Sequence, residues 1–207
     1  MRDTFNFTTM NTFKGLPIFQ AEISDLDEGL FDISLVDFPA TKQDFVTFDQ
    51  DKMMFQVQDE ERHIVSGVVM AANQLIYRRS PKLGEYYLTF SPETIEAMVL
   101  KMFKEGKQNN VTLMHNNQLV PGVTMLEMFI KDEKRGINPS YLQNVPDGSV
   151  IASYKVENQE LWELIKQGEF RGFSITGLFS IMPEDEPSEL DDIMNLIHQV
   201  KGKYGLK

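Results

Sequence analysis

The sequence has no cysteine among its 207 residues. This absence excludes disulfide bonds, thiolate metal sites and cysteine nucleophiles. Histidine is scarce, with three residues, and neither an HExxH motif nor a nucleotide-phosphate loop is present. We therefore expect an activity that needs no metal and no other cofactor.

Long hydrophobic runs are also missing. No apolar stretch approaches the roughly 20 residues of a membrane span, and the first 15 residues lack the apolar core of a secretory signal. We expect synthesis in the cytoplasm and no membrane partner. The formal charge of −11 argues against a nucleic-acid partner, because phosphate contacts require clustered lysine and arginine.

What is present suits one globular core with mixed secondary structure. The chain is 42% hydrophobic and 25% charged, as in ordinary globular proteins. Alternating apolar residues predict strands in an antiparallel or mixed sheet. These strands are residues 30–38, 43–48, 65–79, 85–90, 111–115, 123–130, 150–156 and 172–181. Residues 49–67 are interpreted as a connector or an exposed hairpin, and residues 132–149 as a surface loop.

Two segments predict helices. Residues 91–106 start with Ser91 as a cap and Pro92 in the first turn, and Gly106 ends them. Their apolar stripe is Ile95, Met98, Val99, Met102 and Phe103. A second helix, capped by Asn158, is expected to bury Leu161, Trp162 and Ile165. After the domain of residues 1–182, residues 183–207 predict an acidic linker and an amphipathic helix.

One serine and one histidine are candidates for chemistry. Ser174 lies within a predicted strand, on the face opposite Phe173 and Ile175. His115 ends the strand 111–115, where alternation gives it the same face as Val111 and Leu113, and an imidazole there could accept a proton from a hydroxyl on a neighbouring strand. His63 and His198 are interpreted as solvated. The GxSxG elbow of α/β-hydrolases is absent, so a nucleophilic serine would belong to another fold.

Two longer segments carry a family resemblance. The stretches QNNVTLMHNN and IASYKVENQELWELIKQGEFRGFSITGLFS resemble the XkdF-like phage serine proteases, relatives of the caudovirus prohead proteases, and the similarity spans roughly residues 29–181. In that group a strand-end histidine and a serine in a GFSI-type strand are the base and the nucleophile. The resemblance thus implies His115 as base and Ser174 as nucleophile.

A third segment suggests the remaining member of a triad. FDISLVDFPAT, residues 31–41, resembles a segment that ordinary prohead proteases carry after their serine strand. Here it precedes the histidine, so the order resembles a circular permutation. Asp32 aligns with the acid of that segment and shares a face with Ser34. The alternatives are Asp37 and His198.

The resemblance implies both a fold and an activity. The expected fold is α+β, a herpesvirus-protease-like β-barrel or curved sheet with packed helices. Ser174 would attack a peptide carbonyl, His115 would move the proton and Asp32 would orient the imidazole, while Gly172 and Gly177 would let substrate approach. The substrates would be scaffold and capsid-protein extensions, and the enzyme itself, inside a prohead in the host cytoplasm. The tail could bind scaffold or join a homo-oligomer.

A second function remains open at this point. The same chain could be a catalytically inactive structural component of the phage head that retains a protease-like fold. The distance between the Ser174 hydroxyl and the His115 ring distinguishes the two functions, because a general base must reach its proton donor.

Overall fold

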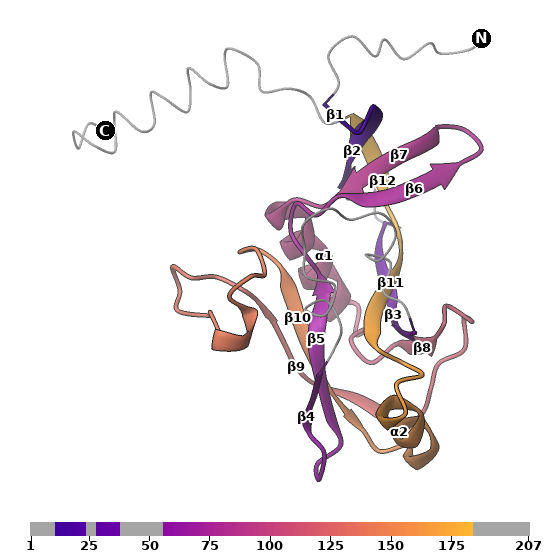
Figure 1. The fold of residues 1–207 in the computed structure, drawn as a ribbon, viewed down its shortest axis with the longest axis vertical. Coiled ribbons are helices and arrows are strands. Elements are labelled where there is room, and N and C mark those ends of the chain that lie inside the picture. Colours follow the sequence, from indigo (N-terminus) through magenta and orange to yellow (C-terminus); the bar gives the residue numbers. More distant parts are fainter. Residues whose placement is uncertain (1–10, 24–27, 38–55, 184–207) are drawn as a thin grey trace, which may run out of the picture.

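The computed structural model describes residues 11–23, 28–37 and 56–183. In these ranges the fold is α+β, with three sheets and two α-helices, which confirms the expected class (Figure 1). Parallel and antiparallel pairs both occur, as predicted. The expected strand 43–48, the tail helix and His198 lie outside the described residues.

Each sheet is open within the described ranges, so the closed barrel, one of the two expected forms, is not observed. The first sheet has the order β1-β2-β7-β6, with β12 also paired to β2. Its strands are β1 (Thr12–Phe13), β2 (Leu16–Glu22), β6 (Ile76–Ser80), β7 (Gly84–Thr89) and β12 (Ser180–Pro183).

The second sheet has the order β4-β5-β10-β9 and is antiparallel throughout. Its strands are β4 (Gln56–Asp59), β5 (Ile64–Met70), β9 (Val123–Ile130) and β10 (Val150–Val156). The described part of the segment interpreted as a connector or an exposed hairpin is a hairpin, but its exposure was predicted wrongly, because its second strand, β5, is wholly buried between β4 and β10. The loop between β9 and β10 contains a short 3-10 helix, Ser140–Leu142.

The third sheet positions the candidate site. It has the order β11-β3-β8, in which β3 (Gly29–Val36) is antiparallel to β11 (Gly172–Leu178) and parallel to β8 (Val111–Leu113). The chain leaves β11 and enters β12 almost at once, so the predicted strand 172–181 is divided between two sheets. A register shift between Thr176 and Gly177 precedes this change of sheet.

Both helices begin at the predicted caps. The Ser91 side chain accepts a hydrogen bond from the backbone of Thr94 at the start of α1 (Pro92–Lys104), and Asn158 accepts one from Leu161 at the start of α2 (Gln159–Lys166). In α1 the buried stripe contains Ile95, Met98 and Met102, whereas Phe103 is exposed, contrary to prediction. No helix in the described ranges is long and apolar enough to cross a bilayer.

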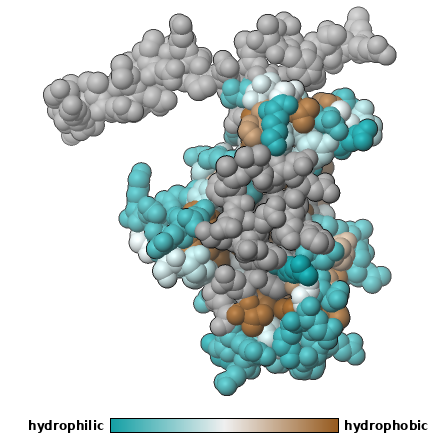
Figure 2. Space-filling model, in the orientation of Figure 1, coloured by the Kyte–Doolittle hydropathy of each residue, from teal (hydrophilic) through white to brown (hydrophobic). Residues whose placement is uncertain are grey.

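The main core joins all three sheets and both helices. Trp162 of α2 is 1% exposed and stacks on the ring of His63, with the ring centroids 4.5 Å apart. His63 is therefore half-buried, although the sequence predicts a solvated side chain, because the hairpin turn directs it onto α2. On the face shown in Figure 2, most of the coloured surface is hydrophilic, as expected when the apolar residues are internal.

Candidate active site

Polar residues form a row across the third sheet. Ser174 of β11 lies opposite Ser34 of β3, and Ser34 lies opposite Thr112 of β8. Thr176 lies opposite Asp32, two residues from Ser34 and so on the same face. Apolar neighbours such as Ile33, Leu35 and Phe173 point into the core. The alternation of these strands thus places five polar side chains on one face.

His115 reaches this face through a turn. Strand β8 ends at Leu113, and Met114 and His115 both adopt left-handed backbone angles, with φ of 48° and 56°. Such angles in non-glycine residues cost about 1–3 kcal/mol each and occur preferentially at functional sites. The turn places the imidazole beside Ser34 and not, as alternation predicts, on the face of Val111 and Leu113. The prediction is wrong because it extends the strand two residues too far.

The structure brings His115 and Ser174 together. Nε2 of His115 lies 3.0 Å from the Ser174 hydroxyl oxygen, which is hydrogen-bond distance. Ser174 is buried, whereas the ring of His115 is exposed to solvent. A serine paired in this way with an imidazole has the geometry of an activated nucleophile and its base.

The other ring nitrogen of His115 contacts two hydroxyls. Nδ1 lies 3.1 Å from the oxygen of Ser34 and 2.8 Å from that of Thr176. Either oxygen can accept a hydrogen bond from Nδ1–H. If Nδ1 carries the proton, Nε2 has a free lone pair toward Ser174, which is the tautomer that a general base requires.

Asp32 ends this chain of hydroxyls. Ser34 lies 2.5 Å from Thr112, and Thr112 donates to the Asp32 carboxylate at 2.9 Å. Ser34 is also 3.4 Å from that carboxylate. An ionised carboxylate only accepts hydrogen bonds. Thr112 therefore donates its hydroxyl proton to Asp32, and Ser34 donates its own to Thr112. The Ser34 oxygen then keeps its lone pairs for Nδ1–H of His115.

This arrangement differs from the expected triad in one respect. Among the described residues, the Asp32 carboxylate contacts Ser34 and Thr112 and not the imidazole. The alternative acid, Asp37, lies just beyond β3. The sequence analysis did not identify Ser34, Thr112 and Thr176. The hydroxyls of Ser34 and Thr176 contact the His115 ring, and Thr112 connects Ser34 to Asp32. The signal for Ser34 was its face shared with Asp32, whereas Thr112 requires knowledge of the β3–β8 pairing.

Gly177 has a different role from the one expected. A side-chain carbon there would lie 2.5 Å from the carbonyl oxygen of Gly29 and 2.3 Å from the Phe179 ring. The backbone that approaches this glycine is thus that of β3, at the register shift of β11. The glycine is required for the fold at this point, and a role in admitting substrate is not needed to explain it.

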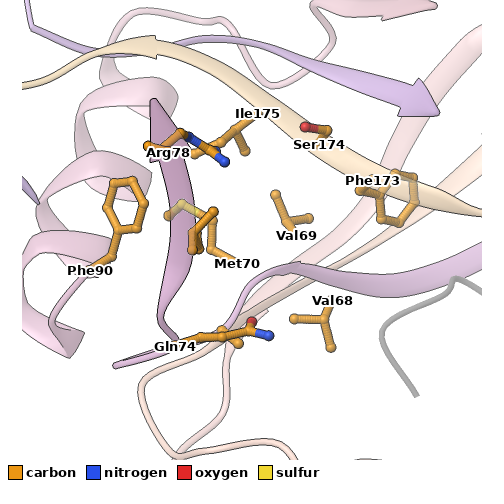
Figure 3. Close-up of a pocket in the computed structure, with 11 residues that line it drawn as sticks. Val68, Val69, Met70, Gln74, Arg78, Phe90, Phe173, Ser174 and Ile175 are labelled. Carbon is orange, nitrogen blue, oxygen red and sulfur yellow. The ribbon is translucent and has the colours of Figure 1, made fainter. Parts of the chain in front are cut away.

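Two hollows adjoin the dyad. A wide depression of about 360 Å³ is lined by His115, Thr176, Arg78 and neighbouring apolar residues. A smaller cavity of about 40 Å³ lies between β5 and β11 and has Ser174 in its wall (Figure 3). Within the described ranges, no group of three or more His, Cys, Asp or Glu residues could hold a metal ion.

Comparisons with known proteins bear on the same residues. Neither the curated proteins nor the solved structures gave a significant match. A protein-family model described as "Putative phage serine protease XkdF" matches residues 51–182, more than half of the chain. The match includes His115 and Ser174, whereas Asp32 and Ser34 precede it, so it is narrower than the similarity expected over residues 29–181. This chain therefore belongs to the family of XkdF-like phage serine proteases.

Proposed function

We propose that the protein is a serine endopeptidase of phage head maturation, with Ser174 as nucleophile and His115 as general base. The observation that carries the proposal is the 3.0 Å contact between Nε2 of His115 and the Ser174 oxygen. Membership of a family named for serine proteases supports the same chemistry.

The proposed reaction follows the usual acyl-transfer sequence. The Ser174 oxygen attacks the carbonyl carbon of the scissile peptide bond while its proton moves to Nε2 of His115. The imidazolium then gives this proton to the leaving amine as the carbon–nitrogen bond breaks. A water molecule attacks the acyl-enzyme in the second half, again losing its proton to His115, and Ser174 is regenerated.

Asp32 acts in this proposal through hydroxyl groups. The imidazolium carries a positive charge after proton transfer, and Nδ1–H donates to Ser34 or Thr176. Thr112 hydrogen-bonds both Ser34 and Asp32. Through these bonds the negative charge of Asp32 polarises the Ser34 hydroxyl and makes its oxygen a better acceptor for Nδ1–H. Asp32 and Thr112 are positioning residues, whereas Ser34 contacts the base itself.

The biological setting is part of the proposal. We propose that the substrates are the scaffold and major capsid protein of the encoding phage, and the enzyme's own chain, cleaved in a prohead in the host cytoplasm. We also propose a homo-oligomer, and a circularly permuted relationship to the herpesvirus-type protease fold. The resemblance of residues 31–41 to a segment that ordinarily follows the serine strand supports the permutation.

Cleavage of phage head proteins tests this function. The full chain is incubated with scaffold and major capsid protein of the encoding phage, and new termini are identified by mass spectrometry. We expect discrete new termini with the native chain and none with Ser174→Ala. If both head proteins stay intact with native enzyme whose Ser174 is reactive, the head-maturation substrates are wrong. If Ser174 is unreactive as well, the structural-component function replaces the enzyme.

A further inference from the structure

The small cavity beside Ser174 has an unusual chemical lining. Most of its wall is apolar and comes from β5, β11 and Phe90. Two polar side chains, Gln74 and Arg78, also line it, and Figure 3 shows them at opposite ends, with Arg78 beside Ile175 near the β11 ribbon and Gln74 at the end farther from that ribbon. We call this cavity, lined by Gln74, Arg78, Phe90, Phe173, Ser174 and Ile175, the Arg78 pocket.

Arg78 is a partly buried cation without an anionic partner in the described part of the chain. Its guanidinium donates one hydrogen bond, to the carbonyl of Tyr77 at 3.0 Å, and no described carboxylate forms an ion pair with it. Burial lowers the pKa of Arg78 and outweighs the opposing effect of the nearby Tyr86, as expected when a cation is desolvated without a carboxylate partner. The guanidinium has five N–H donors, so most of them remain available.

Gln74 is the second unsatisfied group. It is 6% exposed, and its Oε1 is buried without a hydrogen-bond partner in the described residues. Buried amide groups normally have partners, so this unpaired oxygen calls for an explanation such as a bound water, an ion or a functional role. Gln74 thus adds a second unpaired polar group to the pocket wall, at the end opposite Arg78 (Figure 3).

The location of the pocket limits what it can recognise. Ser174 is part of the wall, and Arg78 also borders the wider depression that contains His115. A side chain that enters the pocket must therefore belong to a substrate residue next to the scissile bond. Apolar walls strengthen the attraction between a guanidinium and a carboxylate, because the effective dielectric constant is lower there than in water.

We propose that the Arg78 pocket binds the carboxylate of a substrate aspartate or glutamate adjacent to the cleaved bond. This inference rests on the proposed peptidase function. The carboxylate accepts hydrogen bonds from the Arg78 guanidinium. Lysine and arginine are excluded by like charge, and apolar residues leave the guanidinium unpaired.

Peptidyl diphenyl phosphonates test the preference without a known substrate. These reagents phosphonylate an activated serine, and the side chain next to phosphorus occupies the adjacent pocket. We measure labelling rates of the full chain with reagents that differ only in a glutamate-, aspartate-, glutamine-, valine- or lysine-like side chain. The faster carboxylate reagent should exceed its amide counterpart by about a hundredfold, since a site built for a polar group rejects analogues that lack it.

Two substitutions assign the preference to Arg78. In Arg78→Met the ratio of carboxylate to amide rates should fall to about one, and in Arg78→Glu the lysine-like reagent should become the fastest. Arg79→Met is the matched control, because Arg79 is the exposed neighbour on the same strand, and it should keep the native ratio. Melting temperatures verify that each variant is folded.

The possible failures are distinguishable. A small fluorophosphonate without a peptide side chain reports the reactivity of Ser174 independently of the pocket. If it labels Ser174 but the carboxylate and amide reagents react equally, the pocket proposal is wrong and the enzyme remains. A native ratio in folded Arg78→Met also overturns it. If the fluorophosphonate does not label the native chain, the proposed function fails, and the pocket proposal fails with it.

Discussion

The Ser34 hydroxyl oxygen lies 3.1 Å from Nδ1 of His115. A catalytic histidine usually receives this support from a carboxylate, which fixes the tautomer and stabilises the imidazolium. Here the carboxylate of Asp32 is connected to the ring through Ser34 and Thr112. Neutral hydroxyls must therefore orient the imidazole here, a task that a carboxylate ordinarily performs by direct contact.

Ser34 and Thr176 should each partly compensate for the loss of the other as hydrogen-bond acceptor for Nδ1 of His115. Both contact Nδ1 of His115, so Ser34→Ala or Thr176→Ala alone should reduce kcat/KM by about tenfold or less, since one acceptor remains. The double variant should lose more than about a hundredfold in kcat/KM, which is more than the product of the single effects, because the effects of residues that share a partner are not additive. Thr124→Ala, at an exposed position of β9, is the control. Independent effects would contradict a shared role at Nδ1.

Asp32→Asn should reverse the direction of the hydrogen bonds that run from Ser34 through Thr112 to residue 32. An asparagine amide can donate to Thr112, so Ser34 can turn its proton toward Nδ1 and favour the tautomer with hydrogen on Nε2. That tautomer cannot accept the Ser174 proton. We expect kcat to fall by about 10²–10⁴-fold with little change in KM, by analogy with the wrong-tautomer effect in serine proteases. A kcat close to that of the native chain would exclude Asp32 from the relay.

The backbone at Met114 should control the position of His115. Met114 is exposed and has a φ of 48°, a conformation that β-branched residues rarely adopt. Met114→Val should therefore lower both thermal stability and kcat/KM, whereas Met114→Gly should retain or raise stability because glycine accepts positive φ readily. Differential scanning calorimetry and steady-state kinetics check this. Equal effects of valine and glycine would show that the side chain, and not the backbone angle, matters.

The ion pair in the β9–β10 connection should make stability depend on pH. Lys131 is 3% exposed and lies 2.6 Å from Asp147, which is 47% exposed. The Lys131 hydrogen bond lowers the pKa of Asp147, and the Asp147 hydrogen bond raises the pKa of Lys131. The Asp147 contribution is therefore present above its unfolded pKa of about 3.9 and is lost as the pH falls through its lower folded value. The Lys131 contribution is present below about 10.4 and is lost as the pH rises through its higher folded value.

Two variants separate the partners of this pair. Asp147→Asn should lower the melting temperature at pH 7 more than Lys131→Met, because it removes the nearest anion from a buried ammonium, whereas the exposed Asp147 can rehydrate. The difference between the native chain and Asp147→Asn should shrink as the pH falls below about 3. Lys82→Met, at an exposed turn, is the control. A difference that persists in acid would contradict the assignment.

Local signals in the sequence predicted both α-helices, but they missed β1 and β2 and joined β5 and β6 into one strand. The caps at Ser91 and Asn158 gave the correct helix starts, because a cap and its hydrogen-bond partner are close in sequence. The prediction that Phe103 is buried is wrong for the opposite reason. Its apolar spacing is a local feature, but its exposure depends on what packs against α1. The division of strand 172–181 between two sheets likewise follows from pairing with β2 and β3, which are distant in sequence.

The sequence predicted the two central residues of the candidate site but not the hydrogen bonds that connect them to their neighbours. His115 and Ser174 were identified from a motif resemblance, and they lie in contact. The left-handed turn at Met114 and His115 contains no glycine that would indicate it in the sequence. Alternation therefore assigned His115 to the wrong face. The support from Ser34 and Thr112 arises from strand register between segments about 80 residues apart, which periodicity within one strand cannot reveal.

The activation of Ser174 by His115 can be tested by labelling with a fluorophosphonate, followed by peptide mapping. We expect stoichiometric label on Ser174 of the native chain, none on Ser174→Ala, and a large loss of labelling rate in folded His115→Ala. Label absent from a folded native sample, or unchanged in rate when His115 is replaced, would contradict an activated Ser174–His115 pair.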